Sequence, residues 1–257
     1  MNPTSINLNA DLGESFGAWR MGDDAALLQV IGSANIACGF HAGDPVVMRD
    51  TVRLALANGV SLGAHPAFPD LQGFGRRAMQ LSTQELEATI LYQVGALQAM
   101  AAAEGGRVTH VKPHGALNNI ACADANVAAT VARAVRALDR ELILLAPALS
   151  ALEAAGEAAG LRVGREVFAD RSYQADGQLT PRSQPGAVLH DAQACVQHVL
   201  RMLDAGGIVT ADGQRLPTPI HSICVHGDGP DAVASAQQIR LALEKAGFQL
   251  APLTALV

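Results

Sequence analysis

The sequence predicts an α/β protein whose parallel strands form a closed or nearly closed (β/α) barrel. Short apolar runs alternate with amphipathic, alanine-rich segments along nearly the whole chain, which is the pattern of a parallel sheet covered by helices. The run "ELILLAP" (Glu141–Pro147) has no polar alternation, as expected of a strand buried on both faces. The chain has 257 residues, a usual length for a barrel of this kind.

Seven segments are predicted to be strands, because each has a short apolar core bounded by turn-forming residues. They are Ser5–Asp11, Ser33–Cys38, Val60–Pro66, Thr109–Gly115, Glu141–Pro147, Arg165–Asp170 and Ser222–Asp228. Between the last two, Gly206–Ile220 is predicted to be an inserted β-hairpin that turns at Asp212-Gly213. No linker or low-complexity tract interrupts the series, so we predict a single domain over residues 1–257.

Helix starts are marked by capping residues. Asp44 followed by Pro45 predicts an N-cap with proline at the first helical position. The "STQE" of Ser82–Glu85 has the spacing of a capping box. Asp124 is predicted to cap a further helix, and Pro230 to open the last one.

Composition and charge exclude several classes of protein. A net charge of −6 provides no basic field for nucleic acid. No apolar run is long enough for a membrane-spanning helix. The opening "MNPTSINLNADLGES" lacks the basic and apolar regions of a secretory signal, so we expect a cytoplasmic protein. The four cysteines form no CxxC pair and are expected to be buried hydrophobic residues.

Titratable side chains follow almost every predicted strand. Functional groups of a parallel barrel gather where the strands end. Those of this chain are Asp11, Glu14, His41, Asp44, His65, Lys112, His114, Asp170, Arg171, His226 and Asp228. Four of the eight histidines belong to this set, which argues against chance packing. The sequence therefore predicts one polar mouth.

Histidines and carboxylates at one mouth suit either general acid–base hydrolysis or a divalent metal that activates water. The pattern does not choose between them, because HxH, HExxH and HxxEH are all absent. Neither a P-loop nor a GxSxG motif is present, so a nucleotide would be held in another way or by another chain. Arg76, Arg171 and Arg182 could bind a carboxylate or a phosphate.

Several of these residues also have purely structural explanations. Asp44 is accounted for by capping a helix, and Asp70 by a turn. Arg77 is expected to be a solvated surface charge. The remaining histidines are expected at strand starts or on helix surfaces, without a functional role: His110, His190, His198 and His221.

Six blocks of sequence resemble the LamB/YcsF family. They are "NADLGESFG", "SANIACGFHAGDP", "GAHPAFPDLQGFGRR", "VKPHGAL", "FADRSYQADGQLTPRSQPGAV" and "CVHGDGP", spread in order between Ile6 and Leu253. The resemblance implies a distorted (β/α)7-type barrel of the glycoside hydrolase/deacetylase superfamily. Two departures from the family pattern are Asn118 in place of a tyrosine and "HGDGP" in place of a form such as "HGDNP".

The resemblance also implies an activity, since the family supplies the A component of bacterial ATP-dependent 5-oxoprolinase. The expected reaction opens the lactam ring of 5-oxo-L-proline to L-glutamate, coupled to ATP hydrolysis. The expected partners are subunits B and C. ATP, with Mg²⁺, is expected to be handled largely by these partners, and whether this chain binds a metal is left open.

Residue roles follow from the resemblance. The carboxylates that would orient or deprotonate the attacking water are Asp11, Glu14 or Asp228. The histidines that would shuttle protons or stabilise an oxyanion are His41, His65, His114 and His226. The expected substrate-binding residues are Lys112, Arg76, Arg182 and Asp44, with Arg182 placed in a lid.

Two other functions are compatible with the same residues. The first is a stand-alone metal-dependent deacetylase or amidohydrolase, in keeping with the superfamily's fold. The second is a non-catalytic subunit that binds a metabolite and regulates a partner complex. The density of acid–base groups at one mouth argues against the second, and the lack of a nucleophile or nucleotide motif argues for it.

Overall fold

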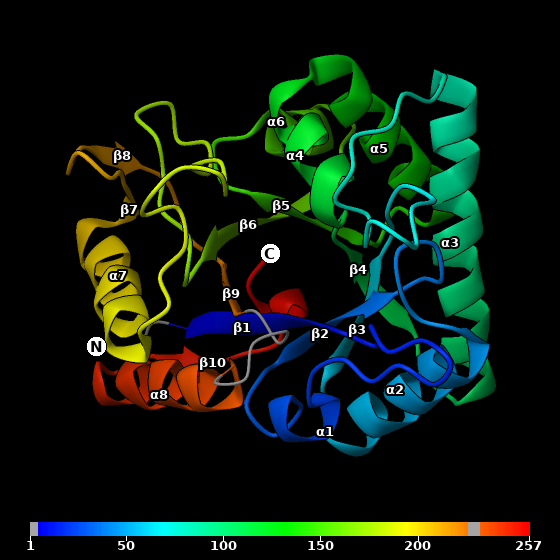
Figure 1. Ribbon diagram of the computed structural model, residues 1–257, viewed down its shortest axis with the longest axis horizontal. Coiled ribbons are helices and arrows are strands. Elements are labelled where there is room, and N and C mark those ends of the chain that lie inside the picture. The colour runs from blue at the N-terminus through cyan, green and yellow to red at the C-terminus, as the bar shows by residue number, and fades with distance from the viewer. Residues whose placement is uncertain (1–4, 226–231) are drawn as a thin grey trace.

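The computed structural model describes residues 5–225 and 232–257, and within them seven parallel strands close into a barrel (Figure 1). The strands are hydrogen-bonded in the order β1-β2-β3-β4-β5-β6-β9, and β9 pairs back with β1. They are β1 (Ser5–Leu12), β2 (Ser33–Ala37), β3 (Ser61–His65), β4 (Val108–Val111), β5 (Ile143–Pro147), β6 (Arg162–Phe168) and β9 (Ser222–Val225). The predicted seven-stranded barrel is confirmed.

Among the described residues, three short strands lie outside the closed ring. β10 (Gln249–Leu250) pairs in parallel with the start of β1. β7 (Gly207–Val209) and β8 (Arg215–Pro217) form an antiparallel hairpin. Its turn passes through Gly213, whose φ of 85° is the left-handed conformation that glycine tolerates. The predicted hairpin is therefore confirmed.

Helices surround the strands, as Figure 1 shows. They are α1 (Asp24–Leu27), α2 (Pro45–Ala57), α3 (Thr83–Ala103), α4 (Gly115–Ala123), α5 (Ala125–Leu138), α6 (Ala151–Ala158), α7 (Ala192–Ala205) and α8 (Ala232–Lys245), followed by the 3₁₀ helix η1 (Leu253–Ala255). The main apolar core lies between strands and helices, where Leu8, Ile36 and Leu62 are fully buried. Among the helices that the structure describes, none has the length and hydropathy needed to cross a membrane.

The predicted helix caps are confirmed where the structure describes them. Asp44 accepts hydrogen bonds from the first backbone amides of α2. Ser82 and Glu85 form both halves of a capping box at α3, and Asp124 caps α5. Pro230, predicted to open the last helix, lies outside the described residues.

The fourth strand is shorter than predicted. We expected Thr109–Gly115, but β4 ends at Val111 and α4 starts at Gly115. Pro113 has no backbone N–H to contribute to a ladder, and Gly115 adopts a φ of 56°. The chain therefore leaves the sheet early and enters a helix that the sequence pattern did not reveal. β6 differs in the other direction, because it begins at Arg162 rather than at Arg165.

Polar side chains fill the inside of the barrel. On β1, Leu8 and Ala10 belong to the apolar core. Asn7 and Asn9, which alternate with them, are fully buried and hydrogen-bonded. Asn9 Nδ2 donates to Glu166 Oε1 over 2.9 Å and to Ser222 Oγ over 2.7 Å, so it joins three strands. Burial of such groups is tolerated because they bond to one another.

Candidate active site

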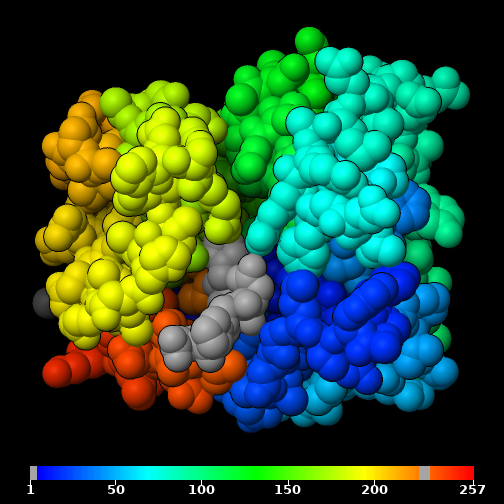
Figure 2. All heavy atoms as spheres, in the orientation of Figure 1, coloured from blue at the N-terminus to red at the C-terminus, as the bar shows by residue number. Residues whose placement is uncertain are grey.

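A large pocket lies at the carboxyl ends of the strands, as the barrel fold predicts. It has a volume of about 590 Å³. Figure 2 shows the hollow on this face, between the cyan segment that follows β3 and the yellow-green segment that follows β6. Its lining includes six residues expected at the mouth, Asp11, Glu14, His65, Lys112, His114 and Arg171, together with Arg76, Asn118 and Arg182.

The first four strands each deliver residues to this site. β1 runs into Asp11 and Glu14, and β3 ends on His65. His41 lies in the turn after β2, which is closed by a hydrogen bond of 2.9 Å from the Gly39 amide to the Ala42 carbonyl. After β4 the chain places Lys112 and His114 in turn, the latter as N-cap of α4.

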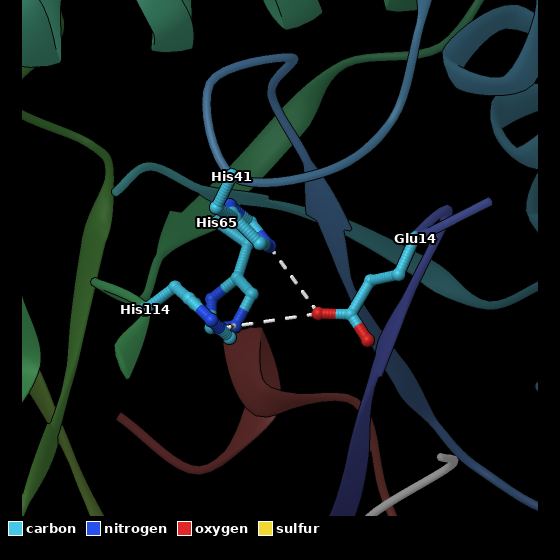
Figure 3. Close-up of side chains that lie close together, drawn as sticks. All are labelled: Glu14, His41, His65 and His114. Carbon is cyan, nitrogen blue, oxygen red and sulfur yellow. Dashed lines mark hydrogen bonds and ion pairs between the residues drawn. The ribbon is translucent and has the colours of Figure 1, made fainter. Parts of the chain in front are cut away.

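Glu14 and three histidines form a compact cluster at the pocket wall (Figure 3). Glu14 Oε1 lies 3.3 Å from His41 Nε2 and 3.9 Å from His114 Nδ1. The rings of His41 and His114 are stacked with centroids 3.8 Å apart. His65 completes the cluster, with its Nε2 3.0 Å from His114 Nδ1.

Backbone carbonyls fix the orientation of two of these rings. The carbonyl oxygen of Lys112 lies 2.6 Å from His65 Nδ1, and that of Phe74 lies 2.8 Å from His114 Nε2. Because a carbonyl can only accept a hydrogen bond, both of these ring nitrogens carry hydrogen. Phe74 holds its carbonyl in place from a left-handed conformation, with φ 54°, which is uncommon for a residue with a side chain.

Burial disfavours the protonated form of two of the three histidines. Burial lowers the pKa of His114 to about 3, and the neighbouring His65 acts in the same direction. Burial, followed by His114 and His65, likewise holds the pKa of His41 well below its usual value. His41 and His114 are therefore neutral at physiological pH.

A buried ammonium group lies beneath the cluster. Lys112 Nζ is 3.1 Å from Asp11 Oδ1, 3.0 Å from Glu166 Oε1 and 3.1 Å from Cys224 Sγ. Burial alone would lower the pKa of Lys112, but the surrounding acidic groups, Asp11 foremost, raise it well above its usual value. The other oxygen of Asp11, Oδ2, lies 3.2 Å from His65 Nε2. Asp11 thus connects the charged interior with the histidine cluster.

Arginines bring positive charge to the pocket. Arg76 stacks over the ring of Phe74, with Cζ 5.0 Å from the centroid. Arg171 is buried and donates to the carbonyls of Ala187 and Thr180, which fastens the segment that covers this side of the pocket. Arg182 is exposed on the same segment and lines the pocket. Such a set of cations suits a carboxylate or phosphate.

Four expected site residues are not among the pocket lining that the structure describes. His41 lies behind this lining, against Glu14 and the ring of His114. Asp44 lies at the start of α2, where Oδ1 accepts from two amides and Oδ2 accepts from Gly17 N over 2.8 Å. It is not a lining residue, so its role as a helix cap accounts for its contacts. His226 and Asp228 lie outside the described residues.

The structure also adds residues that sequence reasoning missed. Glu166 is fully buried beneath the pocket, whereas the sequence predicts it only as part of a strand. His110, expected at the start of a strand, is fully buried within β4, with Nε2 3.1 Å from Asn35 Oδ1. The available signal was that "VTHV" and "REVF" each place two adjacent polar residues in a strand, and since neighbouring side chains point to opposite faces, one of each pair must point inward.

Two neighbouring charges near the pocket have a structural role. Asp70 is an ion-pair partner of Arg77 and accepts from the amide of Gly73 over 2.9 Å. Arg77 holds the pKa of Asp70 down at about 2, and burial opposes this only in part. Asp70 is thus a turn residue, as expected, while Arg77 is tied to it rather than fully solvated.

Known proteins resemble this chain over almost its whole length. The sequence model described as the LamB/YcsF family matches residues 6–257. A relative from Azoarcus sp. (strain BH72), named as the A subunit of 5-oxoprolinase, is 68% identical over 245 residues, covering 95% of this chain and 96% of its own length. A crystal structure of a lactam utilization protein from Thermus thermophilus superposes with a TM-score of 0.91 at 44% identity, covering 97% of this chain and 100% of that one.

A more distant likeness supports the fold alone. The structure of the T48 deacetylase superposes with a TM-score of 0.51 at 15% identity, covering 98% of this chain and 92% of that one. The expected relation to the deacetylase barrels is confirmed at the level of architecture.

Proposed function

The chain belongs to the LamB/YcsF family, and from this premise we propose that it is the A component of a 5-oxoprolinase. It is a hydrolase that opens the cyclic amide of 5-oxo-L-proline to give L-glutamate. The support is the relative of 68% identity with that name and the structural neighbour described as a lactam utilization protein. The observation that carries the chemistry is Asp11, held between Lys112 and His65 at the floor of the pocket.

The substrate is a small anion with one polar cyclic amide. Its carboxylate would be held by the arginines of the pocket, among which Arg182 is exposed and Arg76 is fixed over Phe74. A planar guanidinium can bond both oxygens of a carboxylate at once. The lactam would then face the floor of the pocket, where Asp11 and His65 lie.

Ring opening requires a proton acceptor, a nucleophile and a proton donor. Water adds to the lactam carbonyl carbon while Asp11 accepts its proton. The carbon–nitrogen bond then breaks, and the nitrogen receives a proton and becomes the α-amino group of glutamate. The carbonyl carbon becomes the side-chain carboxyl group. A carboxylate fixed by Lys112 3.1 Å away is suited to this task because it needs no reorientation during the reaction.

Coupling to ATP belongs to the same proposal. A lactam carbonyl is a poor electrophile, and its amine is a poor leaving group. Transfer of the terminal phosphoryl group of ATP to the lactam oxygen releases ADP and makes the carbon reactive. Water then adds to this carbon and the carbon–nitrogen bond breaks, which leaves a glutamyl phosphate, and a second water cleaves it to L-glutamate and phosphate. This sequence has no P-loop, so we propose that subunits B and C, with Mg²⁺, perform the phosphoryl transfer. We also propose that the complex works in the cytoplasm.

The decisive experiment measures glutamate release from 5-oxo-L-proline with ATP. It compares this chain alone, the candidate B and C subunits alone, and the mixture of all three. The expected result is turnover in the mixture only, lost when Asp11→Asn replaces the wild-type chain. The matched control is Asp176→Asn, since Asp176 is an exposed carboxylate of the same pocket.

Other outcomes would favour the alternatives. Amide hydrolysis by this chain alone, without ATP, would support a stand-alone amidohydrolase. Turnover by B and C alone, merely stimulated by the Asp11→Asn chain, would support a regulatory subunit. No turnover in any mixture of folded, associated subunits would contradict the assignment to 5-oxoprolinase.

A further inference from the structure

We propose that Glu14, His41, His65 and His114 form a binding site for one divalent metal ion of the zinc class. Each residue offers one donor atom, and the donor atoms all lie within 4.8 Å of one another. Donors bound to one ion at about 2.1 Å are at most about 4.2 Å apart, so small side-chain shifts would bring them to ligand distance.

The hydrogen bonds of two rings give the strongest reason for an ion. His65 Nδ1 and His114 Nε2 each donate to a backbone carbonyl. In a neutral imidazole the other nitrogen then has a lone pair and no hydrogen. The two lone-pair nitrogens, His65 Nε2 and His114 Nδ1, nevertheless lie only 3.0 Å apart. When both rings are neutral, neither nitrogen can donate to the other, and a cation shared between them accounts for their approach.

The same contacts are those that metal-binding histidines usually make. A ligating histidine commonly donates its second nitrogen to a carbonyl or carboxylate, which fixes the tautomer and the direction of the lone pair. The carbonyls of Lys112 and Phe74 do this for His65 and His114. The Phe74 carbonyl is presented from a left-handed backbone conformation, so the position of this partner is held by the surrounding fold.

The site is rigid and largely closed to water. His65 ends β3, and the other three residues lie in the segments that directly follow β1, β2 and β4 (Figure 3). Its three histidines are at most 5% exposed. Within the part of the chain that the structure describes, His41 Nδ1 has no hydrogen-bond partner, an arrangement that leaves His41 Nε2 directed at Glu14 as its polar contact.

The donor set indicates the class of ion. Three imidazoles and one carboxylate suit Zn²⁺, Co²⁺ or Fe²⁺, whereas Mg²⁺ and Ca²⁺ prefer oxygen ligands. The carboxylate of Glu14 offsets part of the ion's charge, and Asp11 lies beside the cluster, 3.2 Å from His65. Such an ion would supply a Lewis acid at the pocket wall. This inference rests on ligand geometry and not on the lactam reaction.

Direct metal binding tests the proposal. The full-length chain is stripped with a chelator and titrated with Zn²⁺ by calorimetry, and Co²⁺ is added separately as a spectroscopic probe. We expect one Zn²⁺ per chain and the visible ligand-field absorption of protein-bound Co²⁺, with no comparable binding of Mg²⁺. Absence of stoichiometric Zn²⁺ binding would overturn the proposal and assign the short nitrogen–nitrogen contact to a shared proton.

Variants locate the ion. Glu14→Gln and His114→Gln should each weaken Zn²⁺ binding at least about tenfold. His190→Gln is the matched control, because His190 is exposed and lies outside the cluster. Urea unfolding of the stripped proteins shows whether each variant folds. If His114→Gln does not fold, Glu14→Gln, which keeps the shape of the side chain, still tests the proposal. Unchanged binding in Glu14→Gln would place the ion elsewhere, such as on the buried thiols, and overturn the proposal.

Discussion

Lys112 Nζ lies 3.0 Å from Glu166 Oε1 and 3.1 Å from Asp11 Oδ1, so one buried ammonium group joins the interior of the barrel to the floor of the pocket. The side chains of Glu166 and Lys112 are almost completely buried, and that of Asp11 is 12% exposed. Charges at these depths are weakly screened by solvent. The electrostatic state of the proposed proton acceptor therefore depends on a residue that does not line the pocket.

Replacement of Glu166 should lower stability. Glu166→Gln keeps the shape of the side chain but leaves Lys112 with one compensating carboxylate fewer. Removing one partner of a buried ion pair costs about 3 kcal/mol, and we expect a loss of unfolding free energy of this order in urea titrations. Glu157→Gln is the control, since Glu157 is about half exposed in its pair with Arg165. Equal, small effects of both changes would show that the buried pair does not matter for stability.

Replacement of Asp11 should remove activity while the chain still folds, although it also takes a carboxylate from Lys112 and should lower stability as Glu166→Gln does. Asp11→Asn retains the hydrogen-bonding shape but cannot accept a proton from water. We expect glutamate release by the complete complex to fall by about 100-fold or more, with the position of the urea transition as the check on folding. Turnover within a few-fold of that of the Asp176→Asn control would show that another group is the base.

Loss of a rim arginine should weaken substrate binding rather than the chemical step. Arg182 is exposed and lines the pocket, so Arg182→Ala leaves no buried group unpaired. We expect KM for 5-oxo-L-proline to rise about tenfold, since a hydrogen bond to a charged group contributes about 1.5–3 kcal/mol, with kcat nearly unchanged. Arg140→Ala, at an exposed turn away from the pocket, is the control. A fall in kcat at constant KM would instead place Arg182 in the reaction itself.

His110 should make stability depend on pH. Burial, followed by Lys112 and His65, lowers the pKa of His110 from 6.5 to about 3. Between these values the unfolded chain binds a proton that the folded chain does not. The contribution of His110 to the free energy of unfolding is therefore complete above pH 6.5 and is lost as the pH falls toward 3. The free energy of unfolding then changes by at most about 1.4 kcal/mol per pH unit through this group.

The measurement for His110 is a series of urea titrations between pH 5 and 7, the range set by these pKa values. His110→Gln should have a shallower dependence on pH than the wild type, because one titrating group is gone. Parallel curves for the two proteins would contradict a depressed pKa at this position.

Two glycines allow backbone strain to be separated from crowding. A Cβ added at Gly75 would lie 2.8 Å from His41 Cβ and 2.9 Å from His114 Cδ2, whereas one added at Gly105 would meet nothing within 4 Å. Both residues have positive φ, so each change to alanine should cost about 1 kcal/mol in strain. Gly75→Ala should lose more than this and also lose turnover. Equal urea midpoints for the two variants would show that the histidine cluster tolerates displacement.

The strands and caps could be predicted because their signals are local. The capping box of Ser82 and Glu85 and the N-cap at Asp44 depend on residues within one helical turn. The gathering of His65 and His114 at one mouth followed from the rule that parallel strands end at one edge. These parts of the fold and the site could therefore be predicted from the sequence.

The contacts among the polar side chains inside the barrel could not be predicted from the sequence. Glu166 and His110 meet Lys112 and Asn35 only after strands far apart in the chain have closed into a ring. A single polar residue in an apolar strand does not reveal which partner will neutralise it. The early end of β4 was missed for a local reason, since Pro113 was counted as part of the strand.

The polar filling of the barrel has a consequence for attempts to move this site to another scaffold. Asn9, Asn35 and Glu166 hold Lys112 or Asp11 from below, through contacts of 2.9–3.4 Å. If only the residues that line the pocket were transferred, Lys112 would lose these hydrogen-bonding partners. Its side chain would then turn toward solvent or adopt another rotamer. The transferable unit is a column of side chains that runs down the barrel axis, and its lower half is as much a part of the design as the surface that meets the substrate.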